Sequence, residues 1–82
     1  MKIKQAEKTI LKSIDPGYKS IARDVNGDLT VFEIKPTKCV SKGYWDGERY
    51  CQINVFSKLF EWIKWEDKEP FLIKEVIKDG KY

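Results

Sequence analysis

The sequence predicts an α+β domain in which an N-terminal helix packs on a small antiparallel β-meander of four or five strands. Two observations favour this fold class. Apolar residues recur at helical spacing over residues 1–14, and runs of β-forming residues flank the turn dipeptide Asn26-Gly27. With 82 residues and 41% hydrophobic side chains, the sequence has the size and composition of one small globular domain. We expect residues 1–82 to form that single domain.

The helix predicted over residues 1–14 carries two stripes of side chains. The apolar stripe follows the i, i+3/i+4 spacing, with Leu11 at its edge: Ile3, Ala6, Ile10 and Ile14. Lysines at every fourth position form the second stripe: Lys4, Lys8 and Lys12. This lysine stripe is typical of a solvated face, and its alternative interpretation is a contact for an acidic partner or a phosphate backbone. Asp15-Pro16-Gly17 ends the helix, because the residue before a proline avoids the α region.

A β-hairpin is predicted over residues 21–36, and its register depends on the turn. If the Asp-Val-Asn segment before Gly27 forms a type I turn, with that glycine in a G1 bulge, Ile21 shares a face with Val31. A two-residue type I′ turn would instead pair Ile21 with Phe32. We favour the bulged register, because two aspartates flanking Asn-Gly suit a wider, solvated tip.

Residues 38–45 and 48–55 are predicted to form a second hairpin around Asp46-Gly47, another strong turn dipeptide. This pairing would bring the backbones of Cys39 and Cys51 near each other. Two reduced thiols are the expected state of this pair. The alternatives are a zinc site, which needs two further ligands, and a disulfide, which needs Cα atoms within about 7 Å of each other.

The predicted β-meander spans residues 18–65 and ends with two short elements. Residues 56–61 are expected to form one helical turn, and residues 62–65 a short aromatic and β-branched strand. Residues 70–78 fit two structures. Pro70 at a first helical position favours a short helix, whereas the alternating apolar residues that follow would also suit an edge strand.

Charge and composition narrow the function classes. The net charge of +3 lies wholly in residues 1–20, which carry five lysines against one glutamate and one aspartate. The absence of histidine removes the commonest general base and the commonest zinc ligand, and no phosphate-binding or nucleophile-elbow motif occurs. We therefore expect no catalytic residues, no metal and no cofactor. No signal-peptide or membrane-spanning pattern is present, which predicts a cytoplasmic protein that does not engage a membrane.

The candidate binding residues are rings and cations near the tip of the second predicted hairpin. They are Tyr44, Trp45, Arg49 and Tyr50, with Lys38 and Lys42 below them. Tyrosine, tryptophan and arginine dominate the hot spots of protein interfaces. The same rings interleaved with cations would also stack single-stranded bases, provided that a continuous basic groove joins the three cationic side chains. A purely structural interpretation remains open, in which Trp45 and Tyr50 cover one end of the core.

Several short motifs resemble a group of small, generally uncharacterised proteins of phages and prophages of Gram-positive bacteria. The matching residues follow the pattern ARDxNGDL…KP…W…IKWEDxEP within residues 18–73: Tyr18-Lys19, Ile21-Ala22-Arg23-Asp24, Asn26-Gly27-Asp28-Leu29, Lys35-Pro36, Trp45, Ile63-Lys64-Trp65-Glu66-Asp67 and Glu69-Pro70. The resemblance implies no catalytic residues. It implies a phage accessory protein, a class that often binds a host machine and in some cases blocks a host defence such as a CRISPR nuclease.

The sequence thus predicts a small non-catalytic binding protein, a monomer or homodimer, that occupies a surface of a host protein or protein–nucleic-acid machine in the host cytoplasm. Direct binding of single-stranded nucleic acid through the aromatic and basic hairpin is the alternative.

Overall fold

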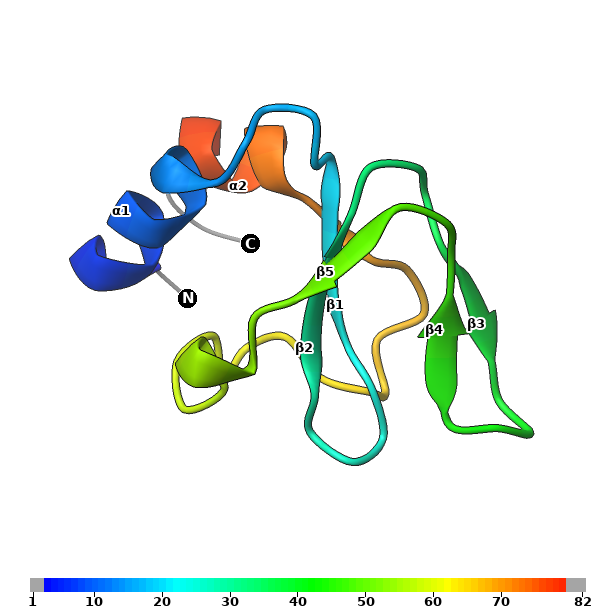
Figure 1. The fold of residues 1–82 in the computed structure, drawn as a ribbon. Helices are drawn as coiled ribbons and strands as arrows, with labels where there is room; N and C mark the ends of the chain where they lie inside the picture. Colours follow the sequence, from blue (N-terminus) through cyan, green and yellow to red (C-terminus); the bar gives the residue numbers. More distant parts are fainter. Residues whose placement is uncertain (1–2, 80–82) are drawn as a thin grey trace.

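The computed structural model describes residues 3–79 of the chain. Its elements are, in chain order, α1 (Gln5–Ser13), β1 (Ser20–Arg23), β2 (Leu29–Phe32), β3 (Thr37–Cys39), β4 (Tyr44–Asp46), β5 (Tyr50–Gln52), the 3₁₀ helix η1 (Asn54–Phe56), β6 (Phe71–Leu72) and α2 (Ile73–Asp79). Helix α1 packs beside a four-stranded antiparallel sheet, and β3 and β4 form a separate two-stranded sheet (Figure 1). The α+β class predicted from the sequence is confirmed.

The first hairpin has the bulged register. Ile21 pairs with Val31, the N–H of Gly27 donates to the carbonyl of Asp24 at 3.0 Å as in a type I turn, and Gly27 has a φ of 96°. This left-handed conformation is one that glycine adopts without strain. Strands β1 and β2 form the centre of the sheet, whose order is β5-β2-β1-β6.

The prediction of a second hairpin around Asp46-Gly47 is wrong, because residues 38–45 and 48–55 do not pair with each other. Strand β3 pairs with β4, so the turn lies at residues 40–43, and β5 pairs instead with β2. Cys39 and Cys51 consequently lie in two different sheets. Gly47 does not form a hairpin tip but passes close to Phe32, where an added Cβ would approach the ring to 2.9 Å. The sequence could not reveal this pairing, because β5 pairs with the free edge of β2, which is distant in the sequence, and not with the strand before the nearest turn.

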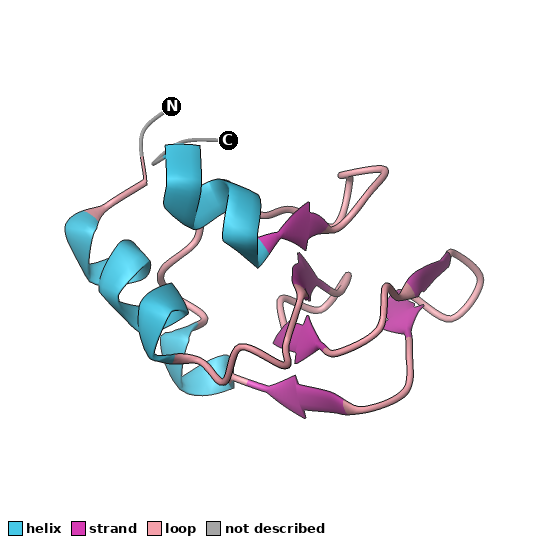
Figure 2. Cartoon of the chain, turned by 90° about the horizontal axis from the view of Figure 1, so that it is seen from above, coloured by secondary structure: helices cyan, strands magenta, loops and turns pink. Residues whose placement is uncertain are grey.

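Both faces of the central strands of the four-stranded sheet are covered, which explains why every residue of β2 is buried, whereas the edge strand β5 is exposed. The helices lie on one side of the sheet and the two-stranded sheet on the other (Figure 2). The core on the helical side consists of Leu11, Ile21, Leu29, Val31, Phe60, Trp62, Ile63, Ile73 and Val76. A second, smaller cluster on the opposite side consists of Ala22, Phe32 and Trp45, with Trp65 packed against it.

The helical turn predicted over residues 56–61 and the strand predicted over residues 62–65 are both wrong. After η1 the chain runs through turns and irregular backbone to residue 70. Phe60 lies in this loop with a φ of 59° and a fully buried side chain. Such a conformation is strained for a bulky residue and persists only where the surroundings hold it.

Arg23 at the end of β1 holds this loop from one side. Its guanidinium donates to five backbone carbonyls: Ile63 (2.8 Å, from Nε), Gly27 (2.8 Å) and Ser57 (3.1 Å) from Nη1, and Leu59 (2.9 Å) and Phe60 (3.1 Å) from Nη2. An arginine has five N–H donors, and here each contact goes to a backbone oxygen that lacks a regular ladder partner. Burial lowers the pKa of Arg23, and Glu61 opposes this shift. The group stays charged, since arginine remains protonated in proteins.

Glu7 of α1 holds the loop from the other side. Its carboxylate is 1% exposed and accepts hydrogen bonds from the N–H of Phe60, the indole Nε1 of Trp62 (3.1 Å) and the N–H of Lys4 (2.9 Å). Burial by itself would raise the pKa of Glu7, but these three donors and the charge of Lys4 lower the pKa below its ordinary value.

The ends of the chain partly match the predictions. Helix α1 begins at Gln5, and the first two residues of the predicted helix lie outside the described residues. Ala6 of the predicted apolar stripe is exposed, whereas Glu7 beside it is buried. Both structures foreseen for residues 70–78 occur in sequence, because β6 pairs with β1 and α2 follows it directly. Neither helix of the described part of the chain is long and apolar enough to cross a membrane.

Replacing Arg23 with Lys is expected to lower the free energy of unfolding by about 2–3 kcal/mol, because an ammonium has fewer donors than a guanidinium and leaves buried carbonyls without partners. Denaturant unfolding measures this. The matched control is Arg49→Lys at the chain's other arginine, which is exposed and should change stability by less than about 0.5 kcal/mol. Equal stability of the two variants would contradict the role given to Arg23.

Replacing Glu7 with Gln is expected to cost about 1–3 kcal/mol at neutral pH, because the amide presents N–H groups where backbone and indole N–H groups already point. The folded-state pKa of Glu7 is lowered. Its contribution is therefore present above the unfolded-state pKa of about 4.3 and is lost as the pH falls through the folded-state value.

The difference in unfolding free energy between wild type and Glu7→Gln should accordingly shrink between pH 7 and pH 3. Glu48→Gln, at an exposed carboxylate, is the control and should show little difference at either pH. A gap that stayed constant with pH would show that Glu7 is not a buried, charged acceptor.

Candidate functional site

A groove of about 540 Å³ is lined by the turns of the first hairpin and of the β3–β4 hairpin and by residues of β2, β4 and β5. We call it the aromatic groove. Its aromatic lining residues are Phe32, Tyr44, Trp45 and Tyr50, and its charged lining residues are Asp24, Asp28, Asp46 and Lys42. Tyr44 is 36% exposed and Tyr50 is 59% exposed, so both rings offer surface to a partner. Phe32 and Trp45 are buried, and the ring centroid of Phe32 lies 6.3 Å from that of Tyr50.

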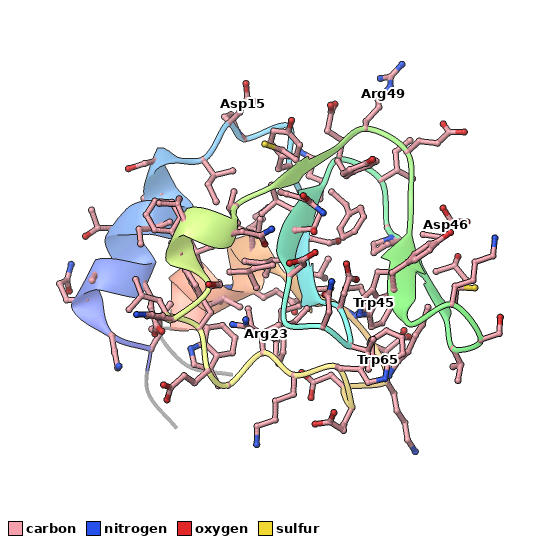
Figure 3. All side chains as sticks on the ribbon, turned by 60° about the horizontal axis from the view of Figure 1, so that its bottom comes forward. Asp15, Arg23, Trp45, Asp46, Arg49 and Trp65 are labelled. Atoms are coloured by element: carbon pink, nitrogen blue, oxygen red, sulfur yellow. The ribbon has the colours of Figure 1, made fainter. Side chains whose placement is uncertain are left out.

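Trp45 is a fixed part of the core. Its side chain is 5% exposed, its Nε1 donates to the carbonyl of Arg23 at 3.2 Å, and its backbone N–H donates to Oδ1 of Asp24 at 2.8 Å. Figure 3 shows Trp45 beside Trp65, in agreement with their shared cluster. The structural interpretation of Trp45 raised by the sequence therefore holds for this ring.

The ammonium group of Lys38 is also bound within the fold. Its Nζ donates to the carbonyl of Trp65 and, at 3.0 Å, to the carbonyl of Asp67. It lies 4.3 Å from the ring centroid of Trp65 and 5.6 Å from that of Trp45, within the range of a cation–π contact. Lys38 does not line the aromatic groove.

The other predicted residues remain accessible. Lys42 is exposed and lines the aromatic groove together with Tyr44 and Tyr50. Arg49 is exposed, lies in the link between β4 and β5, and points away from the body of the protein (Figure 3). The structure thus brings Tyr44, Tyr50 and Lys42 together in the lining of one groove, and leaves Arg49 outside it.

Three carboxylates that sequence reasoning did not assign to the site make the groove acidic. Asp24, Asp28 and Asp46 against Lys42 give a charge of 1 − 3 = −2. Burial raises the pKa of Asp24, the hydrogen bond from the N–H of Trp45 opposes this, and the nearby charge of Asp28 adds to the rise. The available signal was the pair of aspartates that flank Asn-Gly, since a hairpin tip presents both at one place.

The turns at the rim of the groove support each other. The N–H of Val25 donates to the carbonyl of Gly43 at 3.0 Å, which joins the tip of the first hairpin to the tip of the β3–β4 hairpin. The amide of Asn26 donates to Asp28 at 3.1 Å and accepts from its N–H at 3.0 Å. Gly43 has a φ of 77°, and an added Cβ would lie 2.6 Å from Val25. The rim is therefore built from interlocked turns rather than from free loops.

The two cysteines are free and separate. Cys39 is half-buried with its Sγ 3.7 Å from Oγ of Ser41, and Cys51 is exposed with its Sγ 3.7 Å from the carbonyl of Gln52. Over residues 3–79, no three histidine, cysteine, aspartate or glutamate side chains come together in a way that would hold a metal ion.

Comparisons of the chain with protein-family models, with curated proteins and with solved structures find no match. The groove and its surroundings are therefore the basis for assigning a function.

The structure separates the two neighbouring rings of β4 by role, and this can be tested. Replacing Trp45 with Ala should lower the free energy of unfolding by about 3–5 kcal/mol, because it removes a buried ring and leaves a cavity. Replacing Tyr44 with Ala should cost about 1 kcal/mol or less, because that ring is partly solvated. Thermal or denaturant unfolding compares them. A Trp45→Ala protein as stable as Tyr44→Ala would show that Trp45 is not part of the core.

Proposed function

We propose that the chain is a non-catalytic binding protein whose aromatic groove receives a segment of a partner protein. The observation that carries this proposal is the exposure of Tyr44 and Tyr50 in the lining of a groove that also includes Phe32 and Trp45, two rings fixed by core packing, and for Trp45 also by hydrogen bonds. Rigid aromatic side chains provide a large contact area at low entropic cost, and a preformed groove reduces the ordering cost of binding.

The charges of the groove favour a partner that presents arginine or lysine. Asp24, Asp28 and Asp46 line the groove with a single lysine. An arginine side chain entering it would meet carboxylate acceptors and two exposed tyrosine rings, which is the setting for charge-assisted hydrogen bonds and cation–π contacts. Basic surfaces of this kind occur on proteins that bind nucleic acids, so a protein–nucleic-acid machine suits the groove well.

Arg49 is a second candidate contact outside the groove. It has a φ of 52° although it is not glycine, and it is exposed. A glycine at this position would relieve the strain. An arginine held there in spite of the strain is consistent with a contact to a partner at the edge of the site.

Direct binding of single-stranded nucleic acid has weaker support. It requires a continuous basic groove that joins Lys38, Lys42 and Arg49. Of these three, only Lys42 lines the aromatic groove, and the ammonium of Lys38 is bound to two carbonyls. The carboxylates of the groove would repel phosphates.

The sequence resemblance to small phage and prophage proteins supplies a biological context for the proposal. In that context the protein acts in the cytoplasm of a Gram-positive host, where it occupies a surface of a host protein or protein–nucleic-acid machine and inhibits it. A defence nuclease of the CRISPR type is one candidate for such a machine.

The test is affinity capture from nuclease-treated lysate of a Gram-positive host, with the wild-type chain compared against Tyr44→Ala/Tyr50→Ala. The double variant should retain the fold and lose at least tenfold of the captured partner, because loss of two hot-spot rings costs at least about 2 kcal/mol. The control is Val40→Ala/Val55→Ala, two exposed apolar side chains that do not line the groove, and it should capture as the wild type does.

Two outcomes would contradict the proposal. Equal capture by the Tyr44→Ala/Tyr50→Ala variant would remove the groove from the binding surface. Capture that disappears on nuclease treatment, together with a steep fall of affinity as salt rises, would favour direct nucleic-acid binding.

A further inference from the structure

A second groove is lined by residues of α1, of the segment that follows it and of α2. These elements lie at the end of the molecule away from the β3–β4 hairpin (Figure 1, Figure 2). We call it the helical groove. It has a volume of about 780 Å³ and lies between the end of α1, the segment that follows it, and α2. Its floor is formed by the buried side chains of Leu11 and Ile73. Its walls are mainly aliphatic, with partly buried or exposed side chains: Ile14, Tyr18, Leu72 and Ile77.

A rim of lysines surrounds these apolar walls. The four lysines are exposed and line the groove from both of its sides: Lys12, Lys19, Lys74 and Lys78. Two carboxylates also line it, Asp15 and Glu75, so the charge is 4 − 2 = +2. Asp15 is engaged by the N–H of Gly17 at 2.7 Å. Among the described side chains, no ion pair neutralises any of the four ammonium groups.

We propose that the helical groove docks an acidic, amphipathic helical segment of a partner protein. In this mode of recognition, apolar side chains at helical spacing enter an apolar groove and the flanking charges fix the orientation. The apolar walls would receive leucine-type side chains, and glutamate or aspartate residues beside them would reach the lysine rim. The charge is opposite to that of the aromatic groove, so the two grooves suit partner segments of opposite charge.

Two other occupants fit the helical groove less well. A nucleic acid would meet the lysines, but among residues 3–79 the walls offer only one ring, that of Tyr18, and stacking of bases needs several. A bilayer surface requires a convex apolar face with aromatic anchors. Here the apolar residues line a hollow, and those that the structure describes include neither tryptophan nor phenylalanine. The combination of aliphatic walls with a cationic rim is the chemistry that an acidic amphipathic helix complements.

The test uses a fluorescein-labelled peptide of about four helical turns, with leucine at positions i, i+3, i+4 and i+7 and glutamate at the solvent positions. Fluorescence anisotropy should show saturable binding to the wild-type protein that weakens as salt rises. A second peptide, with every glutamate changed to lysine, should bind at least tenfold more weakly.

Charge reversal at the rim supplies the matched comparison. Lys12→Glu/Lys78→Glu should weaken binding of the acidic peptide at least tenfold. Lys58→Glu/Lys64→Glu changes the net charge by the same amount at exposed lysines away from the helical groove, and should change affinity by no more than twofold. Circular dichroism of both variants establishes that the fold is retained.

Each of the following results would overturn the inference. The wild type does not bind the acidic peptide saturably, the two peptides bind equally, or the two double variants weaken binding equally. Binding to phosphatidylglycerol vesicles in preference to the peptide would assign the rim to a membrane surface. A variant ending at Asp79 that binds the peptide at least tenfold more tightly would assign the groove to the chain's own last residues. A concentration-dependent dimer that Lys12→Glu/Lys78→Glu abolishes would assign it to a second copy.

Discussion

The structure depends on the way in which two charged side chains hold the backbone of Phe60. Glu7 accepts the N–H of this residue, and Arg23 donates to its carbonyl. Phe60 is in a left-handed conformation that is strained by roughly 1–3 kcal/mol for a residue of its kind, and both of its backbone groups are buried away from regular secondary structure. Hydrogen bonds to a charged group are stronger than hydrogen bonds between neutral groups. They let an irregular loop take the place of a strand or a helix over the core.

The same part of β1 joins this core to the aromatic groove. The side chain of Arg23 reaches the loop on the helical side of the sheet, while its carbonyl accepts the indole N–H of Trp45 on the other side. The next residue, Asp24, accepts the backbone N–H of Trp45 and lines the groove. The position of the β3–β4 hairpin over the sheet is therefore linked to the packing of the helices by two consecutive residues, and a partner would meet a surface that is already ordered.

The sequence predicted those features whose causes are local. The first hairpin and its bulge follow from the turn at Gly27, and the helical stripe follows from the spacing of its apolar residues. The pairing of β5 with β2 and the loop around Phe60 could not be predicted, because their determinants are remote: Glu7 lies 53 residues from Phe60 along the chain, and Arg23 lies 37 residues from it. The buried Glu7 also broke the rule that assigns a glutamate within a polar helix face to solvent.

For the candidate site, residue types were a better guide than geometry. Tyr44, Tyr50 and Lys42 gather as their composition suggested, whereas Trp45 and Lys38 are used within the fold. A tryptophan ring or a lysine side chain can pack within a small core as well as contact a partner. Trp45 and Lys38 belong to the fold because the β3–β4 hairpin covers the second face of the central strands, which the sequence did not reveal.

The net charge of +3 conceals a separation that bears on binding. The excess of lysine in the first quarter of the sequence contributes to the rim of the helical groove, and the aspartates of the hairpin turn line the aromatic groove at the other end. The electrostatic screening length at physiological salt is about 8 Å, which is short compared with the longest extent of the molecule, 34 Å. Each groove therefore attracts its partner with its own local charge, and a small domain with a modest net charge can offer two electrostatically distinct surfaces.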